Sequence, residues 1–137
     1  MRKIKFRGKV MWNGNHKFSG DWVYGYYRNN DNGNAFITET VDDFDNYIFD
    51  EIEIDENTVG QFTGLKDKNG KEIYEGDILK IDKEDYKYIV KFYSGCFVTV
   101  NKYDEHYEQA KALGSLFTLE IEIIGNIYDN PELLEEE

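Results

Sequence analysis

The chain has 137 residues, the size of one ordinary domain or two small ones, and such a length buries roughly two-thirds of the unfolded surface. A single cysteine excludes an internal disulfide, and a net charge of −12 argues against an extended phosphate-binding surface. Aromatic residues make up 16% of the chain and proline occurs once, which favours half-buried pleated sheets over helices.

The first ten residues alternate apolar and cationic side chains, the period of a strand with one face in the core. The predicted core face consists of Ile4, Phe6, Gly8 and Val10, and the predicted solvent face of Lys3, Lys5, Arg7 and Lys9. This segment carries +5 within a total of −12, which leaves −17 for the rest of the chain. We interpret it as a paired outer strand whose cations offset acidic neighbours, and the alternative is a basic arm for nucleic acid.

A hairpin follows, with predicted strands over 22–27 and 35–38 after a polar loop over 12–20. The segment Asn29–Asn34 joins them as a turn, because it shares the composition of a calcium loop but not the EF-hand spacing of ligands. The acidic segment 42–51 is predicted to be a solvated charge run, with weak cation binding as the alternative.

The stretch 58–81 holds most of the turn chemistry and predicts three short strands separated by two turns, after a strand that contains Ile52 and Ile54. Its structural motif consists of Gly60, Gly64, Asp67, Asn69, Gly70, Gly76 and Asp77. Asn69-Gly70 predicts a type I′ turn with two successive residues at positive φ. Asp67 and Asp77 are expected to accept hydrogen bonds from nearby backbone N–H groups. We interpret the glycines as backbone devices, because they lack the spacing of a phosphate-binding loop.

The C-terminal part continues the β pattern with one interruption. The sequence predicts a hairpin of 86–93 with 97–100 joined at Ser94-Gly95, a closing strand through 119–128 with a bend at Gly125, and a brief helix after Asn130-Pro131. Asp104–Leu113 is the main helix candidate, with Asp104 as its cap and Gly114 as its stop.

Groups suited to catalysis or metal binding are sparse. Cys96 and His106 are a conceivable nucleophile and base, but a lone cysteine in an apolar strand is usually a packed side chain. His16, Cys96 and His106 lack the paired spacing of a zinc site. We therefore predict no catalytic residue, no metal and no cofactor.

Aromatic side chains offer the better candidate for function. We predict an interaction surface from Trp22, Tyr24, Tyr26, Tyr88 and Tyr93, and the alternative is that these residues form cross-strand core pairs.

The run 58–78 resembles the diagnostic core of the YopX family, small proteins of phages and prophages. The matching positions are Thr58, Val59, Gly60, Gln61, Phe62, Thr63, Gly64, Leu65, Asp67, Asn69, Gly70, Ile73, Tyr74, Glu75, Gly76, Asp77 and Ile78. The start 2–7 and the ending 124–134 are also similar, whereas 8–12 departs from the relatives. The resemblance implies a β-rich protein whose C-terminal part is an SH3-like barrel, and it brings no established activity.

We therefore predict a mainly β protein, a small barrel or roll with an N-terminal hairpin region, an SH3-like C-terminal part and one or two short helices. The expected divisions are 1–57, 58–130 and an acidic tail over 131–137. The predicted role is a non-enzymatic phage accessory protein that acts in the bacterial cytoplasm as a protein-interaction module. An acidic decoy for a nucleic-acid-binding site is the alternative, and an enzyme the third hypothesis. We expect a protein partner or self-association, and neither duplex DNA nor a membrane.

Overall fold

The structure, a computed structural model, describes residues 3–11, 20–39, 51–116 and 119–135, so all but the last residue of the predicted loop 12–20 and most of the acidic segment 42–51 lie outside the described residues. The chain divides into two compact units, which we call unit 1 (Met1–Phe62) and unit 2 (Thr63–Glu137). Strand β4 (Glu51–Lys66) contributes its first part to unit 1 and its last residues to unit 2. The division expected at 57/58 falls inside this strand.

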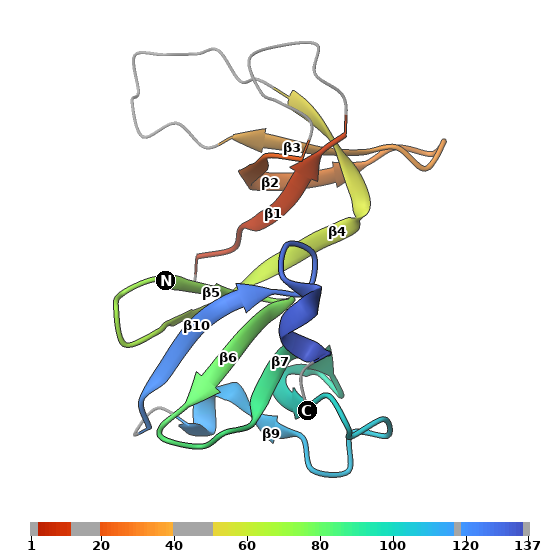
Figure 1. Cartoon of the computed structure of the whole chain (residues 1–137). Coiled ribbons are helices and arrows are strands. Elements are labelled where there is room, and N and C mark those ends of the chain that lie inside the picture. The colour runs from red at the N-terminus through yellow and green to blue at the C-terminus, as the bar shows by residue number, and fades with distance from the viewer. Residues whose placement is uncertain (1–2, 12–19, 40–50, 117–118, 136–137) are drawn as a thin grey trace. The chain divides into compact units, whose positions relative to one another are not determined.

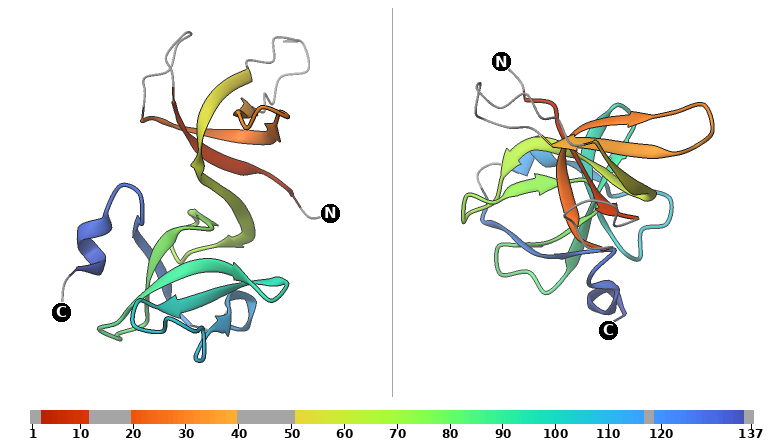
Figure 2. Two further views of the ribbon diagram at one scale, coloured as in Figure 1. Left: turned by 90° about the vertical axis from the view of Figure 1, so that its right-hand side faces the viewer. Right: turned by 90° about the horizontal axis from the view of Figure 1, so that it is seen from above.

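Unit 1 is a ring of antiparallel strands, drawn in red to yellow in Figures 1 and 2. Its strands are β1 (Phe6–Val10), β2 (Trp22–Asn29), β3 (Ala35–Glu39) and β4, in the order β1-β2-β3-β4, and β1 also pairs with β4. The ring encloses a core of Val10, Val23, Ala35, Ile37, Ile52 and Ile54. It does not close evenly, because the β1–β4 register shifts between Arg7 and Lys9.

Strand β1 confirms the predicted pairing but corrects two of its side chains. Ile4, expected in the core, precedes the strand and is 49% exposed. Arg7, expected in solvent, is only 5% exposed, because its guanidinium lies 4.6 Å from the centre of the Trp22 ring. Stacking on the indole replaces part of the lost hydration, which lets a cation occupy a covered position on the strand.

The turn at Asn69-Gly70 is not the predicted type I′ turn, and the turn at Asn30–Asn34 has the same geometry. Asp67 Oδ1 accepts hydrogen bonds from the N–H groups of Asn69 and Lys71, both at 2.9 Å, and Gly70 has φ +81° while Asn69 is not at positive φ. This pattern is a type I turn that ends in a left-handed glycine. The side chain of Asn30 accepts from Asn32 and Asn34 in the same way, with Gly33 at φ +86°.

Unit 2 is built on a five-stranded antiparallel sheet in the order β10-β6-β7-β8-β9, and Figure 1 shows β10, β6 and β7 side by side. The elements are β5 (Glu72–Tyr74), β6 (Asp77–Ile81), β7 (Lys87–Tyr93), β8 (Cys96–Asn101), β9 (Lys111–Ala112), η1 (Leu113–Leu116), β10 (Ile121–Asn126) and η2 (Pro131–Leu134). The core contains Ile73, Leu79, Ile81, Val90, Leu113, Leu116 and Ile121. The prediction of a mainly β fold is confirmed, with short 3-10 helices at η1 and η2.

The β7–β8 hairpin is confirmed, and it holds the type I′ turn that was predicted elsewhere. Tyr93 pairs with Cys96 across the two-residue connection, in which Ser94 has φ +53° and Gly95 has φ +85°. Two successive positive φ values match the right-handed twist of the flanking strands, so this turn aligns the hairpin.

The predicted helix over Asp104–Leu113 is wrong. Residues 101–110 form successive turns in which the N–H groups of Asp104, Tyr107 and Ala110 each donate to the carbonyl three residues earlier. Tyr107 has φ +56°, outside the helical region, and its ring stacks on Tyr93 with centroids 4.6 Å apart. Isolated helices of two to three turns are marginal in water, so these tertiary contacts outweigh the helical pattern.

Candidate functional site

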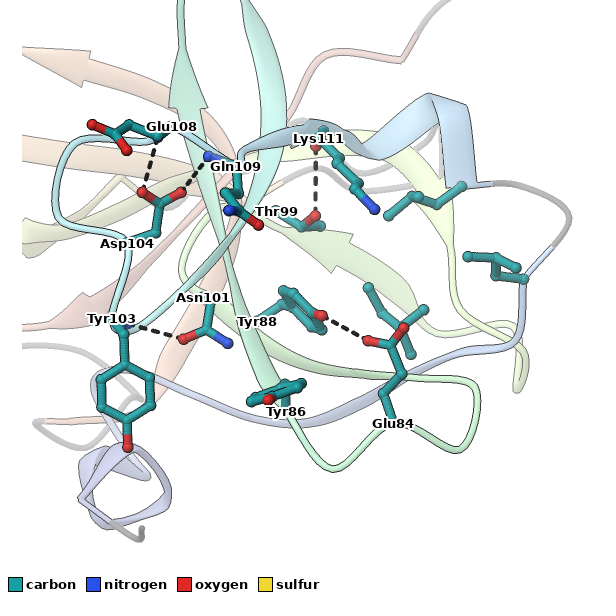
Figure 3. Close-up of a pocket in the computed structure, with 13 residues that line it drawn as sticks. Glu84, Tyr86, Tyr88, Thr99, Asn101, Tyr103, Asp104, Glu108, Gln109 and Lys111 are labelled. Atoms are coloured by element: carbon teal, nitrogen blue, oxygen red, sulfur yellow. Dashed lines mark hydrogen bonds between the residues drawn. The ribbon is translucent and has the colours of Figure 1, made fainter.

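A cavity of about 530 Å³ lies in unit 2 against β7 and β8, between the loop 82–86 and the loop 102–110. Figure 3 shows Tyr103 and Asp104 projecting from the loop on one side and Glu84 from the opposite side. Because tyrosines on both loops and on β7 line it, we call it the tyrosine cavity, after Tyr86, Tyr88 and Tyr103.

The inner wall of the tyrosine cavity continues the core. Ile81 and Leu116 belong to the core cluster of unit 2, and the ring of Tyr88 packs against the same cluster. Thr99 on β8 is 2% exposed, and its hydroxyl donates to the carbonyl of Lys111 on β9 at 3.5 Å. The cavity therefore rests on strands that are held by packing and by a cross-strand bond.

Tyr88 and Glu84 join the sheet to the loop before β7. The phenol of Tyr88 donates to Glu84 Oε2 at 2.6 Å. Burial, and then the hydrogen bond and negative charge of Glu84, raise the pKa of Tyr88 to about 12. The phenol, which is protonated at neutral pH even at the ordinary pKa of tyrosine, acts here as a hydrogen-bond donor to Glu84.

The loop 102–110 is held by carboxylate and amide side chains. Asp104 Oδ1 accepts from the N–H of Glu108 at 2.9 Å, and its Oδ2 from the N–H of Gln109 at 2.7 Å. Asn101 Oδ1 accepts from the N–H of Tyr103 at 2.9 Å. These side-chain bonds replace helical bonds, and they position the ring of Tyr103 at the rim of the cavity.

The rim presents two exposed rings, since Tyr86 is 59% and Tyr103 67% exposed. Both also line a smaller cavity of about 220 Å³ together with Lys87, Lys102 and Leu133. There the ammonium of Lys87 donates to the Leu133 carbonyl at 3.1 Å, and that of Lys102 to the Leu134 carbonyl. The ammonium of Lys102 lies 4.8 Å from the centre of the Tyr103 ring, so this ring already accepts one cation.

The five residues of the predicted interaction surface are divided between the two units. Trp22, Tyr24 and Tyr26 alternate along β2 in unit 1, where Tyr24 is 42% and Tyr26 63% exposed, and the cations of Arg7 and Lys9 lie over Trp22. Tyr88 lines the tyrosine cavity in unit 2, and Tyr93 stacks on Tyr107. Since residues 88 and 93 are an odd number of positions apart on β7, their side chains point to opposite faces of that strand.

Sequence reasoning missed Tyr86 and Tyr103 as rim residues. Both stand among charged and polar neighbours just outside strands β7 and β8, in the runs Lys83–Lys87 and Asn101–Glu105. An aromatic side chain in such a loop has no sheet face on which to pack. An aromatic residue among charged neighbours outside a strand was therefore the sequence feature that could have identified these two residues.

The glycines and aspartates of the structural motif lie in turns and strand pairings, where they shape the backbone. Gly60 lies opposite Arg7 in the β4–β1 ladder, and Gly64, Gly70 and Gly76 have φ of +88°, +81° and +96°. Asp67 Oδ2 accepts from the N–H of Ile123 on β10 at 3.0 Å, and Asp77 Oδ2 accepts from the N–H of Tyr74 at 2.8 Å. The Asp67 carboxylate thereby connects the 67–71 turn to the sheet.

Cys96 and His106, the candidate nucleophile and base, do not line the tyrosine cavity. Cys96 is exposed at the end of the β7–β8 hairpin, with its Sγ 3.7 Å from the Tyr93 carbonyl oxygen, and His106 lies in the loop 102–110. His16 is outside the described residues. Within 3–11, 20–39, 51–116 and 119–135, no group of three or more His, Cys, Asp or Glu side chains is arranged to hold a metal ion.

The same described ranges contain no helix with the length and apolar character needed to cross a lipid bilayer.

Comparisons with known proteins agree on one family. The sequence model described as YopX protein matches residues 5–135. The SPbeta prophage-derived uncharacterized protein YopX of Bacillus subtilis strain 168 is 42% identical over 71 residues, which span 48% of this chain and 52%, about half, of that protein.

Two solved structures share the fold. The crystal structure of protein EF1440 from Enterococcus faecalis matches with a TM-score of 0.56 and 24% identity, over 98% of this chain and 99% of that one. The crystal structure of protein YopX from Bacillus subtilis matches with a TM-score of 0.55 and 22% identity, over 100% of this chain and 99% of that one. With the family match spanning nearly the whole sequence, the chain belongs to the YopX family.

Proposed function

We propose that the protein is a non-enzymatic accessory protein of phage origin that acts in the bacterial cytoplasm by binding an extended polypeptide segment of a partner protein at the tyrosine cavity. The phage origin is supported by the Bacillus subtilis relative, which is a prophage-derived protein. The binding role is carried by one observation, the cavity of about 530 Å³ with two rim tyrosines that are more than half exposed.

The dimensions and composition of the tyrosine cavity suit a ligand. Protein sites for small ligands and for anchoring side chains have volumes of about 300–1,000 Å³ and combine apolar walls with a few polar groups. Here Leu116 and Leu119 supply apolar wall, and Thr99, Asn101 and Gln109 supply polar groups. Tyrosines contribute large contact area at low cost in conformational entropy, and they recur as anchors of protein interfaces.

The chemistry of the cavity supports binding over catalysis. The phenol of Tyr88 donates to Glu84 at 2.6 Å, and its pKa of about 12 lies further from neutral pH than that of an ordinary tyrosine, which disfavours a role as general base. Both carboxylate oxygens of Asp104 accept backbone N–H groups of its own loop, so this carboxylate serves the architecture of the wall.

Selection of displayed random peptides against the full chain tests the proposal. We expect enriched peptides that bind the parent protein and lose at least about ten-fold in affinity for the double variant Tyr86→Ala/Tyr103→Ala, because truncating two aromatic anchors removes most of the rim contact. Tyr26→Ala is the matched control, since Tyr26 is 63% exposed but lies on β2 of unit 1. Peptides that bind the double variant as well as the parent would refute the assigned site.

An acidic decoy for a nucleic-acid-binding protein is the second candidate, supported by the net charge of −12. The two functions differ in their response to salt. A complex held by long-range charge should dissociate between 0.1 and about 0.5 M salt, whereas one anchored by buried tyrosine rings should lose only a few-fold in affinity.

A further inference from the structure

From the side chains that surround the tyrosine cavity, we infer that its occupant is the cationic side chain of an arginine or lysine in the partner polypeptide. The inference rests on the proposed function and specifies what the cavity selects. The lining of the tyrosine cavity combines three tyrosine rings with more carboxylates than cations.

The charged side chains that line the tyrosine cavity are mostly acidic. The charged residues that line the cavity are Glu84, Asp104, Glu108 and Lys111, three acids and one base. Among the described residues of the lining, Lys111 is therefore outnumbered by three carboxylates, which would repel an anionic ligand. The ammonium groups of the nearby Lys87 and Lys102 donate to the Leu133 and Leu134 carbonyls of η2. Lys87 and Lys102 keep their charges, but they line the smaller cavity and not the tyrosine cavity, whose own charged side chains sum to −2 and favour a positive ligand.

The tyrosine rings of the cavity can also attract a cation. The faces of tyrosine rings are negative and attract cations to within about 6 Å of the ring centre. Tyr103 shows this property within the protein itself, because the ammonium of Lys102 lies 4.8 Å from its centroid. Tyr86 and Tyr103 line both the tyrosine cavity and the smaller cavity that contains Lys102, so these two rings border both hollows. A cationic head in the tyrosine cavity would meet the same kind of ring at the rim.

The cavity has an apolar part and a polar part, as a long cationic side chain does. Arginine and lysine carry an apolar stem of several methylene groups below the charge. The cavity is correspondingly divided, with Ile81, Leu116 and Leu119 forming apolar wall while Glu84 and Tyr88 form a hydrogen-bonded polar pair. The Glu84 carboxylate accepts one hydrogen bond, from Tyr88, within the part of the chain that the structure describes. A carboxylate can accept several, so Glu84 can also accept a donor from the ligand.

The test uses nuclear magnetic resonance titration of the isotope-labelled full chain with four short capped peptides. The peptides carry a central arginine, its neutral isostere citrulline, a lysine, or its neutral counterpart norleucine. We expect the arginine and lysine peptides to shift the amide signals of Tyr86, Tyr88 and Tyr103 in a saturable way. Their neutral counterparts should bind about ten-fold more weakly, because they lose the cation–ring and ion-pair attraction. Equal binding of charged and neutral peptides would overturn the inference.

Charge variants give effects of opposite sign. Glu84→Gln keeps an oxygen that can accept from Tyr88 but should weaken binding of the arginine peptide several-fold, whereas Glu105→Gln removes the same charge from an exposed residue outside the lining and should have little effect. Lys111→Gln should strengthen binding about two-fold, as expected for a repulsion across roughly 8 Å of high-dielectric medium. Weaker binding of the arginine peptide to Lys111→Gln would refute the inference.

The outcomes separate the two proposals. If peptide selection yields ligands that depend on Tyr86 and Tyr103 but do not require arginine or lysine, the interaction module stands and the cationic occupant is refuted. If no selected peptide depends on these two rings, the assignment of the binding site is refuted as well. The substituted side chains of the cavity, at 84, 86, 103 and 111, and the controls at 26 and 105 are exposed, so unchanged amide signals outside the cavity will verify that the variants remain folded.

Discussion

Replacing Asp67 should destabilise unit 2 more than its position in a surface turn suggests. Its carboxylate is 7% exposed and accepts three backbone N–H groups, from Asn69 and Lys71 in its own turn and from Ile123 on β10, at 2.9, 2.9 and 3.0 Å. In Asp67→Ala the two turn amides regain water at a cost of about 0.5–1 kcal/mol each, and the half-buried Ile123 amide loses about 1–2 kcal/mol. We therefore expect a loss of about 2–4 kcal/mol in the free energy of unfolding.

The matched control is Asn30→Ala in the other turn of the same geometry. The side chain of Asn30 accepts from the N–H groups of Asn32 and Asn34 and has no long-range bond of the kind that Asp67 makes to Ile123, so its replacement should cost about 1–2 kcal/mol. Asp67→Asn should fall between the two alanine variants, because one amide oxygen serves the turn while the bond to Ile123 is lost. Urea denaturation gives the free energies, and amide hydrogen exchange at Ile123 reports the long-range bond directly. Equal losses in Asp67→Ala and Asn30→Ala would refute this reasoning.

The same carboxylate predicts a dependence on pH. Burial opposes its charge, but the N–H groups of Ile123, Lys71 and Asn69 together outweigh burial and hold the pKa of Asp67 below its ordinary value of 3.8. Because the folded pKa is lower than the unfolded one, the contribution of Asp67 is present above about pH 4 and is lost as the pH falls through the folded pKa. The stability difference between the parent and Asp67→Asn should therefore shrink on acidification below pH 4.

Four further outcomes are expected. Gly70→Val and Gly76→Val should each cost about 1–3 kcal/mol in urea denaturation, because φ values of +81° and +96° strain a branched side chain; unchanged melting would refute the turn assignment. Ser94→Gly should stabilise by about 0.5–1 kcal/mol by relieving a positive φ, and a loss of stability would contradict this. A chain that starts at Met11 lacks β1, which pairs with both β2 and β4, so it should not melt cooperatively at the parent temperature. Random duplex DNA should not be retarded by low-micromolar protein at 0.15 M salt, given the net charge of −12, and a retarded band would favour nucleic-acid binding.

The sequence by itself determined the β class, the hairpins and the position of most turns. These features depend on local physics, since alternation of apolar side chains defines a strand face and glycine tolerates positive φ. The β2–β3 and β7–β8 hairpins could be predicted because their strands are close in sequence and their turn residues have few alternatives.

Tertiary structure alone decided which turn adopts which geometry. Asn69-Gly70 has the stronger local preference for a type I′ turn, yet the carboxylate of Asp67 selects a type I turn by accepting two N–H groups and linking the turn to Ile123. Ser94-Gly95 adopts the type I′ turn instead, because a two-residue connection between paired strands requires that twist.

The tyrosine cavity was also beyond the reach of sequence reasoning. Its rim tyrosines Tyr86 and Tyr103 come from two loops that neighbour each other only after β7 pairs with β8, and the loop 102–110 forms its turns in place of the predicted helix. Periodicity identifies side chains that face a core, but it carries no information about exposed rings outside strands. The pairing of Tyr88 with Asn101 in the β7–β8 hairpin brings the two loops to one end of the sheet. The sequence did not indicate the successive turns over 101–110, which replace the predicted helix and complete the site.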